Sequence, residues 1–284
     1  MKKVLVAGAT GYLGRYLIKE LKKQGYWVRA LARNSNKLED LKDYIDEIFE
    51  AEVTQPDSLI GVCKDIDLVI SSIGITRQKD RLTYMDVDYQ GNSNLLKEVL
   101  RSGVKKFIYV SVLNGQFLKD LKMVEAKERF VDELKASGSE YAITRPNGFF
   151  SDMTELLTMA EKGTVYLFGN GEFKGNPIHG ADLAEFIVQK LDSNETELDI
   201  GGPDVLTQNQ IAQSAFKAVG KKEKIVYVPL WIKNITLKLI RWFSGQKTYG
   251  PIEFFMTVMA MDMVAPTYGK YHLRDFYSEN THKV

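Results

Sequence analysis

Short apolar runs alternate, along the first half of the chain, with segments in which apolar residues recur at helical spacing. The runs are predicted to be strands at residues 4–7, 27–32, 46–53, 67–74, 107–111 and 141–144. After the first run, Leu13, Leu17, Ile18 and Leu21 fall on one face of a 3.6-residue period. Such alternation predicts a doubly wound α/β fold, a parallel sheet covered by helices on both faces.

The pattern loosens after residue 150. Shorter strands are predicted near residues 165–168, 197–200 and 225–228, and helices near 181–191, 207–219, 231–243 and 251–262. No polar linker separates the two halves. We therefore expect a main domain over residues 1–150. A smaller C-terminal substrate lobe over 151–284 would be interleaved with the last strands of the main sheet.

A glycine-rich loop joins the first strand to the first helix. Glycines in such a turn let the backbone approach a pyrophosphate, and the helix N-terminus supplies N–H groups and a positive dipole end. The spacing G-x-x-G-x-x-G is one residue longer than the common G-x-G-x-x-G, and the alternative is a tight turn in a domain that binds no nucleotide. The predicted dinucleotide-binding residues of this loop are Gly8, Thr10, Gly11, Tyr12, Leu13 and Gly14.

The residue that follows the second strand indicates which dinucleotide binds. NAD-binding proteins place an acidic residue there to hold the ribose hydroxyls, whereas this chain has Arg33. A guanidinium can bind a 2′-phosphate through two parallel hydrogen bonds, and Lys37 adds charge nearby. We predict NADPH in preference to NADH; the alternative is an ordinary exposed arginine in a loop.

Composition narrows the remaining classes. The 284 residues carry a net charge of +1, which gives no electrostatic case for nucleic acid as a partner. The single cysteine, Cys63, allows no internal disulfide, and the three histidines show no metal-ligand spacing. That pattern predicts no metal site. No apolar run reaches the length of a membrane span, and the first strand begins within three residues of Met1, so we expect a cytoplasmic protein.

Small residues end the fourth strand, at the sheet edge where open α/β sheets bind their ligands. Ser71, Ser72 and Gly74 are therefore predicted to contact the cofactor. Lys127 lies in a predicted helix at 121–136, inside the apolar stripe rather than opposite it. A lysine in that position needs polar partners, such as ribose hydroxyls, or else extends its ammonium to water while its stem covers apolar surface.

Two further strand ends face the same predicted crevice. Ser111 follows the fifth strand, where a hydroxyl can orient a substrate carbonyl or serve only as a strand-end residue. The turn that leaves the sixth strand contains Pro146, Asn147 and Phe149. Asn147 is predicted to hydrogen-bond the nicotinamide carboxamide, and Phe149 and Phe150 to wall a flat apolar substrate unless they are simply core.

These residues together resemble the short-chain dehydrogenase/reductase superfamily, in its atypical, extended branch with a Rossmann NAD(P)-binding domain. The superfamily's catalytic pair is Tyr-x-x-x-Lys, in which the lysine lowers the pKa of the tyrosine that acts as the acid. The lysine matches Lys127, but Met123 occupies the tyrosine position. The tyrosine-acid mechanism is therefore not carried over.

Within that branch, several stretches look like the divinyl chlorophyllide 8-vinyl reductases and their bacterial relatives. They are residues 125–130, 145–150, 166–171, 200–203 and 266–270. The resemblance implies an NADPH-dependent oxidoreductase, with Lys127 and Ser111 in the catalytic site, that reduces a hydrophobic vinyl or enone-type small molecule. The main alternative is a non-catalytic NADP-binding sensor or assembly factor of the nitrogen-regulator type; a nucleotide-sugar epimerase ranks lower because such enzymes retain the tyrosine.

Residues 229–263 contain two apolar helical stripes. Trp231, Ile235, Leu239, Trp242 and Phe243 form one, and Phe254, Phe255, Val258, Met259 and Met263 form the other. A helix-on-helix core explains them best. The alternatives are a lid over a substrate pocket, a dimer face or a membrane-surface patch. The sequence leaves open whether the protein is a monomer or a homodimer.

Overall fold

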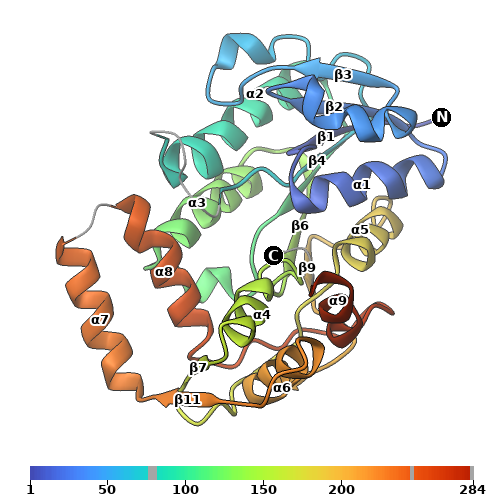
Figure 1. Cartoon of the computed structure of the whole chain (residues 1–284). Helices are drawn as coiled ribbons and strands as arrows, with labels where there is room; N and C mark the ends of the chain where they lie inside the picture. Colours follow the sequence, from blue (N-terminus) through green and yellow to red (C-terminus); the bar gives the residue numbers. More distant parts are fainter. Residues whose placement is uncertain (76–81, 244–245, 282–284) are drawn as a thin grey trace. The chain divides into compact units, whose positions relative to one another are not determined.

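The computed structural model describes residues 1–75, 82–243 and 246–281 of the chain. Over these residues, the main sheet has seven strands in the order β3-β2-β1-β4-β5-β6-β9 (Figure 1). The strands are β1 (Lys3–Ala7), β2 (Trp27–Ala32), β3 (Glu47–Glu50), β4 (Leu68–Ser71), β5 (Lys106–Val110), β6 (Glu140–Pro146) and β9 (Glu197–Ile200). The registered pairs from β3 through β6 are all parallel. The α/β fold with a parallel sheet is thus confirmed.

The strand order reverses at one point. The chain runs outward from β1 to β3 and then returns to place β4 on the other side of β1. The carboxyl ends of β1 and β4 form the topological switch point at which doubly wound sheets bind ligands. Both strand ends were expected from the sequence to contact a cofactor.

Helices cover both faces of the sheet (Figure 1). They are α1 (Tyr12–Lys23) and α5 (Gly180–Gln189) on one face, and α2 (Asn92–Ser102) and α3 (Lys122–Ala136) on the other. The second face holds a buried cluster in which the Phe130 ring of α3 packs against the β5 rings of Phe107 and Tyr109, with centroids 5.6 and 4.7 Å away. Cys63 is buried in the same cluster, as a small apolar residue.

One helix begins in a way that the sequence did not predict. A π-helical segment, Met85–Gly91, directly precedes α2. A π-helix widens the backbone and re-aims its side chains, and such segments often occur at functional sites. Asp88 lies in this segment and is fully buried. Short 3₁₀ helices at Ser35–Tyr44, Pro56–Leu59 and Gly115–Phe117 complete this part of the chain.

The chain divides into two compact units. The first comprises residues 1–145 and 183–198, and the second comprises residues 146–182 and 199–284. In the described part of the second unit, β7 (Val165–Phe168) pairs in parallel with β11 (Ile225–Val228), and β8 (Lys174–Gly175) pairs antiparallel with β10 (Leu206–Thr207). The helices there are α4 (Thr154–Glu161), α6 (Gln208–Ala218), α7 (Leu230–Phe243), α8 (Gln246–Val258) and α9 (Leu273–Asn280).

The prediction of a helix-on-helix core for the stripe on α7 is wrong. Trp231, Ile235, Leu239 and Trp242 are all exposed, and the side chain of Phe243, the fifth residue of that stripe, lies outside the described part of the structure. The second stripe, on α8 and the residues that follow it, is at least half-buried. Helical period shows that a helix has an apolar face, but not that another element covers it. Among the described helices, none combines the length and the apolar character that crossing a membrane would require.

Gly14→Ala tests the closest packing in the first unit. Alanine in a helix normally gains about 1 kcal/mol over glycine. A Cβ on Gly14, however, would lie 2.2 Å from the carbonyl oxygen of Gly8. We expect this overlap to reverse the gain and to lower the free energy of unfolding by about 1–3 kcal/mol, measured by urea denaturation.

Gly148→Ala is the matched control, because its Cβ would meet only the Met153 side chain, at an ordinary 3.5 Å. It should change the free energy of unfolding by less than about 0.5 kcal/mol. If Gly14→Ala changed the free energy of unfolding as little as Gly148→Ala, the turn would have space for a Cβ and the close packing would be refuted.

Candidate active site

The glycine turn after β1 forms an open cradle. Gly8 has φ +85°, and its carbonyl oxygen accepts a hydrogen bond of 2.9 Å from the N–H of Gly11. In this described segment, no side chain caps the N-terminus of α1, and a Cβ on Gly14 would collide with the turn. Helix N–H groups without a capping side chain, reached over a surface of glycine backbone, fit a pyrophosphate.

The other predicted residues of this loop surround the cradle. Thr10 and Gly11 are exposed, and Tyr12 is half-buried with its ring edge-on to Tyr16, at 5.3 Å between centroids. Leu13 is buried, so its contribution to a ligand is limited to its backbone. The turn therefore offers main-chain groups together with the exposed Thr10 side chain.

The segment after β4 links this turn to a second group of residues. The N–H of Ser72 donates to the Ala7 carbonyl at 2.9 Å, and the Ser72 Oγ lies 2.8 Å from where a Cβ on Gly8 would stand. Ser71 instead faces inward and donates to Oδ1 of Asn92 at 2.5 Å. Of the two predicted serines, the structure places Ser72 against the glycine turn and Ser71 in a buried contact.

Gly74, two residues further on, lies against a buried ion pair. Lys127 Nζ is 2.9 Å from Asp88 Oδ1, and the side chains are 14% and 0% exposed. A Cβ on Gly74 would lie 2.6 Å from the ammonium and 2.7 Å from the carboxylate. The other Asp88 oxygen accepts a hydrogen bond from the N–H of Ile75 at 3.2 Å. The Lys127 ammonium therefore turns inward to a carboxylate, beside the predicted cofactor edge.

The charge of this lysine is set by its neighbours. Burial on its own lowers the pKa of Lys127, but the combined effect of Asp88, Tyr109 and Glu128 outweighs burial, and the net pKa lies above its ordinary value. The ammonium is also 5.9 Å from the centre of the Tyr109 ring. Lys127 is thus a fixed cation at neutral pH rather than a proton acceptor.

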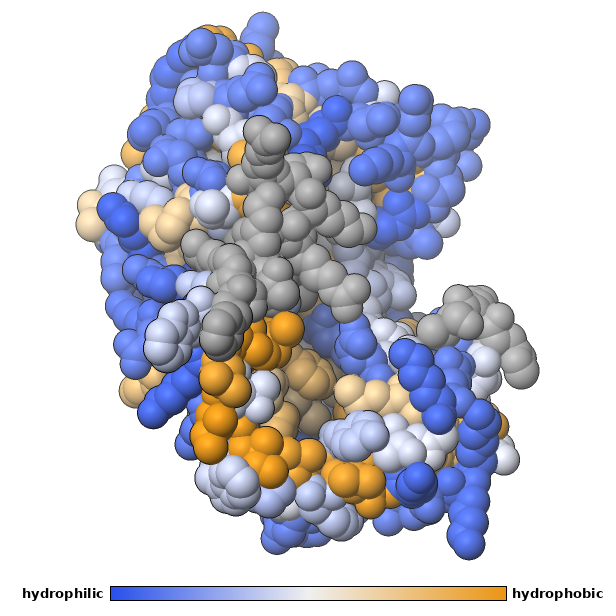
Figure 2. Space-filling view, turned by 60° about the vertical axis from the view of Figure 1, so that its left-hand side comes forward, coloured by the Kyte–Doolittle hydropathy of each residue, from blue (hydrophilic) through white to orange (hydrophobic). Residues whose placement is uncertain are grey.

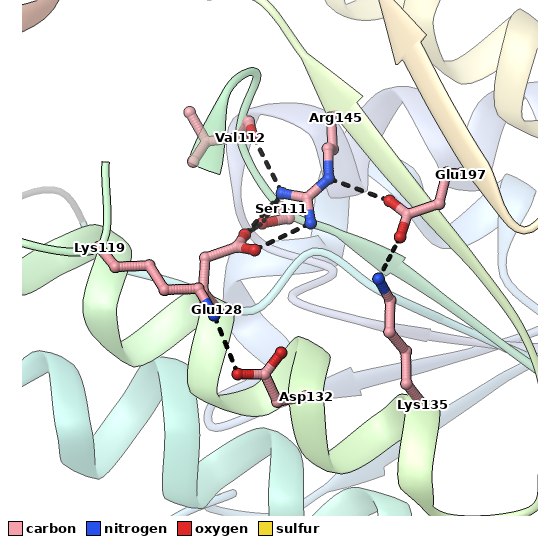
Figure 3. A network of polar contacts seen from close by, with 8 residues as sticks. All are labelled: Ser111, Val112, Lys119, Glu128, Asp132, Lys135, Arg145 and Glu197. Carbon is pink, nitrogen blue, oxygen red and sulfur yellow. Dashed lines mark hydrogen bonds and ion pairs between the residues drawn. The ribbon is translucent and has the colours of Figure 1, made fainter. Parts of the chain in front are cut away.

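The next residue of α3 anchors a different network (Figure 3). Arg145, at the end of β6, donates to both carboxylate oxygens of Glu128, at 2.6 and 2.9 Å, and to Glu197 at 3.1 Å. Ser111 donates to Glu128 at 2.8 Å. Glu128, Arg145 and Ser111 are all buried. The Ser111 hydroxyl, expected to orient a substrate, is therefore bonded to the protein.

The turn after β6 is held within the second unit. Asn147 donates to Asn176 Oδ1 at 2.8 Å and to the Met263 carbonyl at 2.6 Å, and it accepts from the N–H of Gly148 at 2.7 Å. Pro146 is buried, and Phe149 is half-buried. Through these hydrogen bonds, Asn147 stabilises the turn that carries Phe149.

Phe150 belongs to the core of the second unit. Its ring lies 5.5 Å from that of His179 and 5.4 Å from that of Phe276, measured between centroids. Of the two interpretations of Phe150, the structure supports the core residue.

Arg33 is exposed at the end of β2, and its Nη1 lies 3.5 Å from Oε2 of Glu52. Glu52 follows β3, so this acid reaches the nucleotide side of the sheet from a neighbouring strand rather than from the end of β2. A phosphate that binds Arg33 must compete with this carboxylate.

Three acidic partners were missed by the sequence reasoning: Asp88, Glu128 and Glu52. The inward orientation of Asp88 could have been inferred from helical spacing, because Asp88 lies four residues before the buried Asn92 and seven before Leu95. It therefore shares the inward face of a helix, as Lys127 does. Glu52 and Glu128 had no comparable signal, because their partners depend on the pairing of β2 with β3 and on the position of β6.

Comparisons with known proteins agree with this geometry. The family model described as NAD(P)H-binding matches residues 8–194. The chain is 30% identical to the photosystem II assembly factor Ycf39 of Guillardia theta over 233 residues, 80% of this chain and 73% of that one. It is 27% identical to the divinyl chlorophyllide a 8-vinyl-reductase of Arabidopsis thaliana over 317 residues, covering 97% and 76%.

A solved structure shows the same fold. It is the NADPH-dependent quinone oxidoreductase QOR2 of Escherichia coli, in complex with NADPH. The TM-score is 0.76 at 17% sequence identity, over 97% of this chain and 99% of that one. At this identity the likeness concerns the fold alone.

Asp88→Asn tests the buried pair. It leaves the Lys127 ammonium buried without a counter-charge, which should lower the free energy of unfolding by about 3–5 kcal/mol. Adding Lys127→Met removes the stranded charge, so the double variant should be more stable than Asp88→Asn alone. Urea denaturation of the wild type, Asp88→Asn, Lys127→Met and the double variant completes the double-mutant cycle.

Asp132 lies on the same helix as Lys127 and forms an exposed ion pair of 3.1 Å with Lys119, so Asp132→Asn is the control. Its cost should stay below about 1 kcal/mol. Additive effects of Asp88→Asn and Lys127→Met would mean that the two groups do not interact.

Proposed function

The chain belongs to the NAD(P)H-binding family, and from that membership we propose that it is an NADPH-dependent reductase of a hydrophobic small molecule. The bond reduced is a carbon–carbon double bond of the vinyl or enone type. When bound, the cofactor supplies a hydride. The protein supplies the turn that holds the pyrophosphate and the cation beside the ribose.

The observation that carries this proposal is the position of Lys127 relative to Met123. Met123 is buried one helical turn before Lys127. It stands where the short-chain dehydrogenase/reductase superfamily, which the sequence resembles, carries its catalytic tyrosine. A thioether has no proton to give. Reduction of a carbonyl to an alcohol needs an acid at the oxygen. Reduction of a carbon–carbon double bond adds the hydride to one carbon and a proton to the other. Solvent water can deliver that proton, so the reaction does not require an acid at position 123.

Lys127 then has a binding role. Asp88 keeps its ammonium charged, and Gly74, in the segment after β4, places no side chain over the pair. An ammonium has three donors, so one or two remain for ribose hydroxyls after the contact with Asp88. Ser111 and Asn147 support the site indirectly in this proposal: Ser111 holds the end of β5 through Glu128, and Asn147 holds the turn of Phe149.

Turnover is the direct test. The full chain is mixed with NADPH and a panel of enones, vinyl tetrapyrroles and quinones, and NADPH absorbance and product mass are followed. We expect one of the alkene classes to gain two hydrogens while NADPH is consumed. Lys127→Met should lower kcat/KM at least roughly 100-fold, because the ribose loses its fixed cation. Full activity of Lys127→Met would refute the role of this lysine.

The absence of an acid at position 123 also favours a second function, binding NADP without catalysis. Similarity to a protein named as a photosystem II assembly factor agrees with it. The same assay separates the two. A chain that binds NADPH tightly but oxidises none across the panel is a sensor or assembly factor, not a reductase.

Arg33→Asp tests the choice of cofactor. Loss of the guanidinium and gain of a carboxylate should weaken NADPH binding roughly 10- to 100-fold and spare NADH, as calorimetry can measure. Glu52→Gln is the opposing variant, because it frees Arg33 from its carboxylate partner. It should strengthen NADPH binding severalfold. An unchanged NADPH affinity in Arg33→Asp would count against the assignment.

A further inference from the structure

We propose that α7 docks the protein on the surface of a negatively charged lipid bilayer. The helix would lie in the plane of the interface, with its apolar face among the acyl chains and its lysines at the headgroups. The proposal rests on the surface of α7 alone and does not depend on the reaction proposed above.

The apolar face of α7 is long, continuous and exposed. Trp231, Ile235, Leu239 and Trp242 are 63%, 49%, 49% and 83% exposed. Their spacing of three to four residues places them on one side of the helix. Figure 2 brings the α7 side of the molecule forward and shows strongly hydrophobic residues gathered in one band. Isolated surface hydrophobes are ordinary, but a full helical stripe marks an interaction surface.

Tryptophan stands near both ends of this face. Trp231 and Trp242 are eleven residues apart, or about 16 Å along the helix axis. Tryptophan favours the boundary between acyl chains and water, because its ring is apolar and its N–H needs a polar partner. Two such anchors at one level fit a helix that lies flat on a membrane.

The charge around α7 identifies the kind of surface. Residues 224–252 contain five basic residues and no acidic residue, although the whole chain has a net charge of only +1. Arg241 is paired with the buried Glu253, whereas Lys238 is exposed beside the apolar face. Each lysine near an anionic membrane adds attraction that salt screens. Basic residues flanking an apolar face are typical of interfacial helices.

The same positive charge argues against a second copy of the chain as the partner that covers the apolar face of α7. A twofold dimer brings one surface patch against itself, so the lysines of both copies would meet. No acidic residue in 224–252 is available to neutralise them. A lipid surface supplies the negative charge that the chain lacks there.

Vesicle flotation tests the proposal on the full chain. Wild-type protein should float with phosphatidylcholine–phosphatidylglycerol vesicles, bind pure phosphatidylcholine vesicles more weakly, and detach as salt is raised. Trp231→Ala/Trp242→Ala should weaken partitioning to the anionic vesicles at least roughly tenfold. Both side chains are exposed, so the variant should keep its melting temperature.

Phe117→Ala is the matched control. Phe117 is 77% exposed in the first unit, outside α7. Its replacement should leave flotation unchanged. Three results would overturn the proposal: no flotation of the wild type, equal loss in the Phe117 control, or a wild-type dimer that the double tryptophan variant dissociates without any vesicle binding. The last result would identify a second copy as the occupant.

Discussion

At the switch point of the sheet, three glycines lie so close to their neighbours that a Cβ atom would not fit. Gly8 lies against Ser72, Gly14 against the carbonyl of Gly8, and Gly74 against the Lys127–Asp88 pair. Ser72 and Gly74 are two residues apart, so the glycine turn and the ion pair lie within about 7 Å along that segment. This short stretch of chain therefore sets the distance between the glycine turn and the Lys127 ammonium. The proposed cofactor contacts depend on that distance.

Helix α3 is fastened on two sides by consecutive charged residues. Lys127 pairs with the π-helical segment at Asp88, and Glu128 pairs with the end of β6 at Arg145. Burying such pairs contributes little net stability, because desolvation offsets the attraction between the charges. Their effect is geometric: each removes alternative positions that an apolar contact would permit. The position of Lys127 is thus determined by two independent anchors on neighbouring residues.

Local signals were enough to predict the strands of the main sheet, the glycine turn and the unusual position of Lys127, but not the two-residue strands β8 and β10. They were not enough to predict its partner, because Asp88 precedes it by 39 residues and faces it only through a π-helical segment that tertiary packing stabilises. Ser111 and Asn147 were placed at the correct strand ends. Their side chains bond to Glu128 and Asn176 instead, because a buried polar group takes the partners that packing brings within reach.

The error over α7 has a different origin. Periodicity predicted an apolar face correctly but carried no information about what covers that face. Charge carried that information: a helix buried between others does not need three basic residues, and α7 contains Lys233, Lys238 and Arg241 with no acidic residue among its own. Lys127 illustrates the converse, since one charge inside an apolar stripe called for either a polar partner or an ammonium extended to water, and the structure has the buried partner Asp88. In both helices, the residues that break the pattern say more about the surroundings than the residues that form it.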